Sequence, residues 1–375
     1  MTFQRGEASG VIPELEGLRG LLALWVVFGH WATSIQLSFR PLRQNLWDVQ
    51  AVDVFIILSG FVITLLLSRS ETSYRGYLVR RWFRIAPAYI VVLLVSAILF
   101  PAISALRELT PPGEMEAVRV AIQTATQQNF TTHVILHILL LHGLAPTATL
   151  PYAAYSLVGQ AWSISLEWQF YILAPLFYSL VLQWRRRTAL LALAALCGGL
   201  MLAGMYFSPA FLGNKLPLFA LGAASFWLWR RVTTAGKLPV PLASLRWLSA
   251  GAVVLCLAPR LDALLGPALW LVVMHCLLVA RTTPASPEGR LARLLRLPPV
   301  LFLGRISYSL YLVHFLVMLS GMALLVQLTL GAPAYAGLLL LYVVPMSIVA
   351  ASVMYRWVEQ PGIALGRRLS NLLRL

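Results

Sequence analysis

Arg19 and His30 lie on one strongly apolar stretch, LEGLRGLLALWVVFGHW, and are the first residues here that could do chemistry. Eleven positions of an α-helix make about three turns, so both side chains share a face, about 16 Å apart along the axis. They cannot touch, but they can line one cavity, where a near-neutral histidine can take a proton from a hydroxyl. The alternative is that Arg19 reaches the lipid headgroups and His30 donates a hydrogen bond to a neighbouring helix.

Two carboxylates stand near the ends of other apolar stretches. Asp53 opens VDVFIILSGFVITLLL, where it could orient an imidazole or simply lie in the outer membrane interface. Glu167, in GQAWSISLEWQFYILAP, is at a depth from which His30 could be reached if the two helices pack. The alternative for Glu167 is an interfacial carboxylate within an aromatic belt. For Ser59 and Gly60, small residues in the Asp53 stretch, we expect helix packing rather than chemistry.

A cluster of arginines precedes a further apolar stretch, in RGYLVRRWFRIAPAYI. Arg81 and Arg84 are three positions apart and share a helical face, and Arg80 adds charge beside them. Guanidinium groups suit phosphate recognition because their planar fork makes bidentate contacts. An ordinary basic loop is the alternative, and the residues alone favour it.

Two motifs lie near the end of the chain. SYSLYLVHF predicts a polar stripe on one helical face, made by Tyr308, Tyr311 and His314. YRWVEQPG predicts the end of the final helix, with Arg356 and Glu359 paired at i, i+3 and Pro361 stopping the helix. We interpret this second motif as structural.

The composition indicates that lipid is the main solvent of the elements that must position these residues. Hydrophobic residues make up 59% of the 375 positions and charged residues only 11%, whereas a soluble protein would have roughly twice that charged fraction. The net charge of +16 does not indicate nucleic-acid binding, because the basic residues form short clusters between apolar stretches. Cys197, Cys256 and Cys276 show neither metal-ligand spacing nor a disulfide framework, so we expect no metal.

Ten apolar stretches approach the roughly 20 residues that a bilayer-spanning helix needs. They lie near 20–38, 49–68, 85–106, 161–183, 188–207, 212–229, 244–261, 264–280, 300–328 and 332–355. The predicted fold is therefore an all-α membrane protein, a bundle of about ten transmembrane helices. We expect one transmembrane domain over 1–375, with its core at 13–362 and no soluble accessory domain.

The basic clusters predict the orientation. With both termini cytoplasmic, all but six of the 29 Lys and Arg fall on the cytoplasmic side, as the positive-inside rule requires. The six are Arg40, Arg43, Arg107, Arg119, Lys215 and Arg260. The short stretch 133–147 contains His133, His137 and His142. If it crossed the membrane, every later basic cluster would lie on the opposite side, so we predict a re-entrant or interfacial segment there. The polar N-terminal residues do not look like a cleavable signal peptide.

Six of these motifs, in this order, resemble the acyltransferase-3 family of integral membrane acyltransferases. They are LEGLRGLLALWVVFGH, VDVFIILSGFVIT, RRWFRIAPAY, WSISLEWQFYILAP, LGRISYSLYLVHF and YRWVEQPG. Any one of them is weak, but together they extend over about residues 13–362. The resemblance implies a ten-helix bundle that moves an acyl group, usually acetyl from acetyl-CoA, from the cytoplasm to a hydroxyl of a cell-envelope or exported polysaccharide.

The resemblance also implies roles for residues. His30 becomes the catalytic residue, as general base or acyl carrier, and Arg19 its motif partner. Arg81 and Arg84 become donor-binding groups, with Arg80 beside them. Glu167 matches a first carboxylate, but Trp168 stands where many members have a second, so any role that needs paired carboxylates is in doubt.

Other functions stay open at this point. The acceptor can instead be a small molecule such as a macrolide. A different class is a transporter or flippase of a polar or lipid-linked substrate, with His30 and Glu167 on a proton path, although no inverted repeat is present. We expect a bacterial inner membrane. The sequence does not determine the acceptor hydroxyl, acetyl against a longer acyl group, or the oligomeric state.

Overall fold

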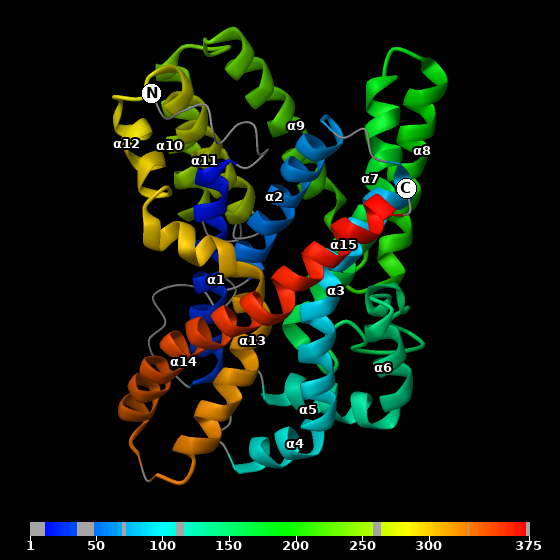
Figure 1. Ribbon diagram of the computed structural model, residues 1–375, viewed down its shortest axis with the longest axis vertical. Helices are drawn as coiled ribbons and strands as arrows, with labels where there is room; N and C mark the ends of the chain where they lie inside the picture. The colour runs from blue at the N-terminus through cyan, green and yellow to red at the C-terminus, as the bar shows by residue number, and fades with distance from the viewer. Residues whose placement is uncertain are drawn as a thin grey trace. The chain divides into compact units, whose positions relative to one another are not determined.

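The computed structural model of the chain describes residues 12–35, 49–69, 73–109, 116–257, 264–328 and 330–372. Within these ranges the named elements are helices, and none is a strand (Figure 1). The all-α class predicted from the sequence is confirmed.

Each of the ten predicted spans overlaps a helix. These are α1 (Pro13–Ser34), α2 (Val49–Leu67), α3 (Tyr74–Ile98), α7 (Trp162–Leu182), α8 (Arg187–Ala203), α9 (Leu212–Ala235), α10 (Leu242–Leu257), α11 (Leu265–Thr282), α13 (Pro298–Leu325) and α14 (Ala332–Met354). Residues 36–38 and 258–261 of two spans lie outside the described residues, and the predicted span 85–106 is divided, because one helix ends at Ile98 and another begins at Phe100. Seven helical stretches of the described chain are long and apolar enough to cross a bilayer. The chain is therefore a multi-pass membrane protein, and the count of ten spans is approximate.

Shorter helices lie between these spans or after the last of them. They are α4 (Phe100–Leu109), α5 (Glu116–Gln128), α6 (Phe130–Ile138), α12 (Pro287–Leu294) and α15 (Gln360–Leu372), with 3₁₀ turns η1 (His142–Leu144), η2 (Gly159–Ala161) and η3 (Gly204–Tyr206). The predicted short segment 133–147 corresponds to α6 and η1. A helix of 9 residues is too short to cross the hydrocarbon core, so this segment does not span.

Packing divides the chain into two compact units, which are described separately below. Unit 1 comprises residues 1–29, 40–69 and 217–307, and unit 2 comprises residues 30–39, 70–216 and 308–375. The boundaries fall inside α1, α9 and α13, so the units are not consecutive stretches of sequence. The prediction of a single domain stays a prediction.

Unit 1 is held by close helix packing around aromatic side chains. A Cβ atom at Gly60 of α2 would lie 2.2 Å from the carbonyl oxygen of Phe219 in α9. A Cβ at Gly222 of α9 would in turn lie 1.8 Å from the carbonyl oxygen of Ile57 in α2. The two backbones therefore approach closely at glycines, as expected for helices that associate in lipid, and the packing role predicted for Gly60 is confirmed.

Unit 2 contains the main correction to the predicted elements. Pro361 does not stop the final helix: α14 continues through a π-helical turn, η5 (Tyr355–Glu359), into α15, which lies along α3 (Figure 1). The wider π turn donates the N–H of Gln360 to the carbonyl of Tyr355, so the register has changed before the proline with its missing N–H. Gly362 and Gly366 bring α15 close to Pro87 and Phe83 of α3.

Gly60→Ala should lower the free energy of unfolding by about 1–3 kcal/mol, because the added methyl group forces α2 and α9 apart. The measurement is thermal unfolding of the purified protein in detergent. Gly198→Ala in α8 is the matched control, since a Cβ there meets nothing within 4 Å, and it should leave stability unchanged or slightly higher. Equal effects of the two substitutions would contradict this account of the packing.

Candidate active site

Arg84 of α3 forms an ion pair with Glu359 of η5, in which the carboxylate is buried and the guanidinium group is partly buried. The Glu359 side chain is only 1% exposed, and its second carboxylate oxygen accepts a hydrogen bond of 2.6 Å from the Ser309 hydroxyl of α13. The Arg84 guanidinium carbon also lies 5.4 Å from the centre of the Tyr308 ring. Three helical segments therefore meet at one hydrogen-bonded charge pair whose carboxylate is buried.

The predicted pairing of Glu359 with Arg356 is wrong. Arg356 is exposed, and its guanidinium carbon lies 5.9 Å from the ring centre of Trp357. A buried carboxylate loses its hydration and requires a charged, hydrogen-bonding partner, and Arg84 supplies this from another helix. Sequence spacing reveals local partners only, so this pair could not be found from YRWVEQPG.

Arg81 lies one helical turn before Arg84, and its guanidinium carbon is 5.8 Å from the ring centre of Tyr171 in α7. The Tyr171 hydroxyl donates a hydrogen bond to Glu167, one turn earlier on the same helix. The Nε–H of Arg81 is buried and has no hydrogen-bond partner among the described residues. Arg81 therefore keeps a donor available within the helices.

We call Arg81, Arg84, Glu167, Tyr171 and Glu359 the arginine–carboxylate layer. Glu167 is close enough to Tyr308 to act on it electrostatically, as are Glu359 and Arg84, so the members share one neighbourhood in unit 2. Two cations and two anions balance formally, which lowers the free-energy cost of burying them together. The sequence named Arg81, Arg84 and Glu167; the positions of Tyr171 and Glu359 became evident only from the fold.

His30 and His314 form a second polar pair in unit 2. Their ring centres are 5.0 Å apart with the planes at 63°, and the Phe315 ring lies 6.0 Å from His30. His314 is fully buried, and its Nδ1 donates to the carbonyl of Leu310 at 3.2 Å. That bond assigns the proton of a neutral ring to Nδ1, so Nε2, which has no hydrogen-bond partner among the described residues, carries a lone pair.

The stripe predicted on α13 links the two groups. Tyr308 donates its hydroxyl to the carbonyl of Ile85 at 2.6 Å, and the Tyr311 hydroxyl donates to the carbonyl of Gln160. All three side chains of the stripe are buried. Six residues separate Tyr308 from His314, so the histidine pair lies about 9 Å along the helix from the arginine–carboxylate layer.

The structure places the remaining predicted site residues as follows. Arg80 donates to the Ser370 hydroxyl at 3.0 Å and to the Asn371 side chain at 3.1 Å, and these bonds hold α3 against α15.

Arg19 is half-buried on α1, next to Gly20, in unit 1. Asp53 is buried on α2 in unit 1, where a Cβ at Gly266 of α11 would lie 2.8 Å from its own Cβ. Because His30 belongs to unit 2, the roles predicted for Arg19 and Asp53 stay predictions.

Trp168 stands where many members of the resembled family have a second carboxylate. Its ring packs edge-on against Trp82 of α3, with centres 5.1 Å apart. An aromatic contact between α3 and α7 therefore occupies the position beside Glu167. The described residues also contain no group of three or more His, Cys, Asp or Glu placed to hold a metal ion.

The histidines of the short segment form a separate buried network. The Ser156 hydroxyl lies 3.0 Å from His133 Nδ1 and 2.9 Å from His137 Nε2, and the rings of His137 and His142 stack at 4.0 Å. Burial lowers the pKa of His142 to about 4, so its ring is neutral near pH 7. Neutral, hydrogen-bonded rings of this kind indicate a structural role in fixing the loop.

Comparison with known proteins gives the class. The model of the acyltransferase-3 family, described as an acyltransferase domain, matches residues 12–352. The chain belongs to this family, and it is an O-acyltransferase embedded in a membrane.

Curated relatives agree with this assignment. The chain is 27% identical to acyltransferase MdmB of Streptomyces mycarofaciens, over 95% of this chain and 93% of that protein. It is 26% identical to the putative peptidoglycan O-acetyltransferase YrhL of Bacillus subtilis and 24% identical to peptidoglycan O-acetyltransferase OatA of Listeria monocytogenes. These matches cover 93% and 81% of this chain but only 54% and 49% of those two proteins. No solved structure matches the chain.

Glu359→Ala should lower the free energy of unfolding by about 3–5 kcal/mol, because it leaves the Arg84 charge without its buried partner. Arg84→Met/Glu359→Leu should be clearly less destabilised than the sum of the single changes, since the double substitution removes both charges. Chemical unfolding in detergent measures the cycle, with exposed Arg356→Gln as the control. Additive effects would show that the pair does not couple.

Proposed function

We propose that this enzyme transfers an acetyl group from acetyl-CoA to a hydroxyl of a cell-envelope or exported polysaccharide, in a bacterial inner membrane. Acyl transfer follows from the family, and the peptidoglycan O-acetyltransferases among the relatives favour a glycan acceptor. The observation that carries the proposal is the sequence of polar groups along α13, with the arginine–carboxylate layer first and the His30–His314 pair about 9 Å farther along.

The arginine–carboxylate layer fits one end of such a donor. CoA carries phosphates, and the buried Nε–H of Arg81 can donate to an anionic or carbonyl oxygen. Arg84 has Glu359 as its partner and Arg80 has α15, so we assign the principal donor contact to Arg81 and supporting roles to the other two. By the positive-inside pattern, this end of α3 faces the cytoplasm, where acetyl-CoA is made.

His30 is the proposed catalytic residue. As a general base, it takes the proton of the acceptor hydroxyl while that oxygen attacks the thioester carbonyl carbon. The C–S bond breaks, the ester forms, and the CoA thiolate takes a proton from the imidazolium to leave as the free thiol. In the alternative, covalent route the imidazole of His30 attacks the thioester carbonyl carbon, the C–S bond breaks and CoA leaves as the thiol with the imidazole proton. The acceptor oxygen then attacks the acetyl-imidazole, the C–N bond breaks, and the hydroxyl proton returns to the imidazole.

His314 is the proposed positioning residue for His30. Its Nδ1 donates to the Leu310 carbonyl, so in the neutral ring Nε2 carries no proton and can only accept a hydrogen bond. An acceptor nitrogen at this ring separation can receive the N–H of His30 and leave the opposite nitrogen of His30 as the base. A second buried carboxylate is then not needed to orient the imidazole.

His30→Ala should lower acetyl transfer by about 10²–10⁴-fold, because the base or nucleophile is lost. Release of free CoA from acetyl-CoA, with a glycan extract present, measures the rate. His275→Gln, a histidine of unit 1, should retain most activity. Comparable activity in His30→Ala and the unmodified chain would contradict the assignment, as would equal losses in both variants.

Arg81→Gln should raise the KM for acetyl-CoA about tenfold and change kcat much less, because a donor contact is removed rather than a reacting group. Steady-state kinetics with varied acetyl-CoA separate the two constants. Arg75→Gln is the control, since Arg75 is exposed at the start of α3. A fall in kcat with unchanged KM would place Arg81 outside the donor site.

A further inference from the structure

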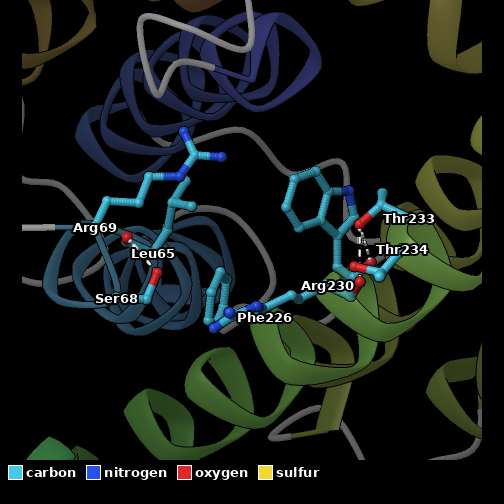
Figure 2. A pocket seen from close by; sticks show the side chains of 8 residues that line it. Leu65, Ser68, Arg69, Phe226, Arg230, Thr233 and Thr234 are labelled. Carbon is cyan, nitrogen blue, oxygen red and sulfur yellow. Dashed lines mark hydrogen bonds between the residues drawn. The ribbon is translucent and has the colours of Figure 1, made fainter.

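A polar pocket lies in unit 1, and the residues assigned to acyl transfer, which belong to unit 2, are not among those that line it. It opens between the last turn of α2 and the last two turns of α9, with a volume of about 370 Å³, within the range of small-ligand sites. Figure 2 shows Arg69 and Ser68 on the α2 side and Arg230, Thr233 and Thr234 on the α9 side. Leu65 and Phe226 supply apolar surface at the same place (Figure 2).

The polar groups of this pocket favour an anion. Two guanidinium groups and three hydroxyl groups line it, and none of the lining residues is acidic. The Thr233 and Ser68 hydroxyls already donate to backbone carbonyls, at 2.9 Å to Trp229 and 2.8 Å to Leu65. The arginines are therefore the groups that set the preference for negative charge.

A buried donor without a partner is the second observation. Trp229 lines the pocket, its side chain is almost fully buried, and its indole N–H has no hydrogen-bond partner among the described residues. The Arg281 guanidinium carbon lies 5.8 Å from the Trp229 ring centre and adds a third positive charge nearby. A buried N–H without an acceptor is destabilising, and an oxygen-rich ligand would relieve that cost.

Arginines at helix C-termini have another explanation, because they stabilise the negative end of the helix dipole. Arg69 follows the end of α2 and Arg230 lies near the end of α9, so both are suitably placed for that role. Dipole stabilisation, however, requires neither a cavity nor an unpartnered indole N–H. A bound anion accounts for all three features.

We propose that this pocket binds a phosphate group through Arg69, Arg230 and the Trp229 N–H. A guanidinium fork matches phosphate oxygens, and the Trp229 indole N–H adds a further donor beside the two arginines. Two sources share this chemistry: the phosphates of a soluble ligand such as CoA, and the phosphodiester of an anionic lipid head group. The proposal does not depend on acyl transfer, because binding can be measured without turnover.

The test uses the full chain in phosphatidylcholine nanodiscs and two probes. Calorimetric titration gives the affinity for CoA, and native mass spectrometry of protein from mixed vesicles gives retention of phosphatidylglycerol over phosphatidylcholine. Arg230→Gln should weaken one of these about tenfold. Its exposed neighbour Arg231→Gln, outside the pocket lining, should change neither more than about twofold.

The two arms identify the source of the phosphate. Weaker CoA binding supports a soluble ligand, and weaker phosphatidylglycerol retention supports a lipid head group. Trp229→Phe keeps the ring and removes the N–H, and it should weaken the same arm about threefold. If Arg230→Gln binds both probes as tightly as the unmodified chain, the proposal is overturned, even if the melting temperature of that variant is lower. Losses of the same size in Arg231→Gln would also overturn it.

Discussion

Burial of charge in an apolar helix bundle is the constraint on which the site depends. An isolated ion inside the helices would cost several kcal/mol, so each charge must find a counter-charge and hydrogen bonds. Arg84, Glu359 and Ser309 meet that requirement by bringing together α3, η5 and α13. The same contact fixes where α13 lies against α3, and it thereby positions the polar stripe that continues to His314.

The π-helical turn follows from the same requirement. An unbroken α-helix through Tyr355–Glu359 would rotate the following residues differently, and the inserted position of a π turn changes the direction in which Glu359 points. Such turns are rare and occur at functional sites more often than elsewhere. Here the turn combines a buried carboxylate with a proline two positions later, and the chain still continues as α15 along α3.

The sequence predicted the elements better than their partners. Hydropathy found a helix at each of the ten stretches, because a span of apolar residues is a property of local sequence. The Arg356–Glu359 pairing and the stop at Pro361 were wrong for a shared reason. Both predictions assumed that a residue's partner and the end of a helix are set by neighbouring residues in the sequence. Glu359 instead pairs with Arg84, 275 positions away in the chain. Tyr171 and Tyr308 were likewise visible as residues but not as contacts of the arginines.

The sequence could predict which residues are candidates for the site, but not which of them contact one another. Arg81, Glu167 and His30 attract attention because polar side chains are costly in lipid, and no alignment of positions is needed to see this. The different partners of the three arginines became evident only from the structure. Arg80 holds α15, Arg84 holds Glu359, and Arg81 keeps a buried donor, although all three occur within five positions. A helix presents successive residues in different directions, so neighbours in one basic cluster can have different partners.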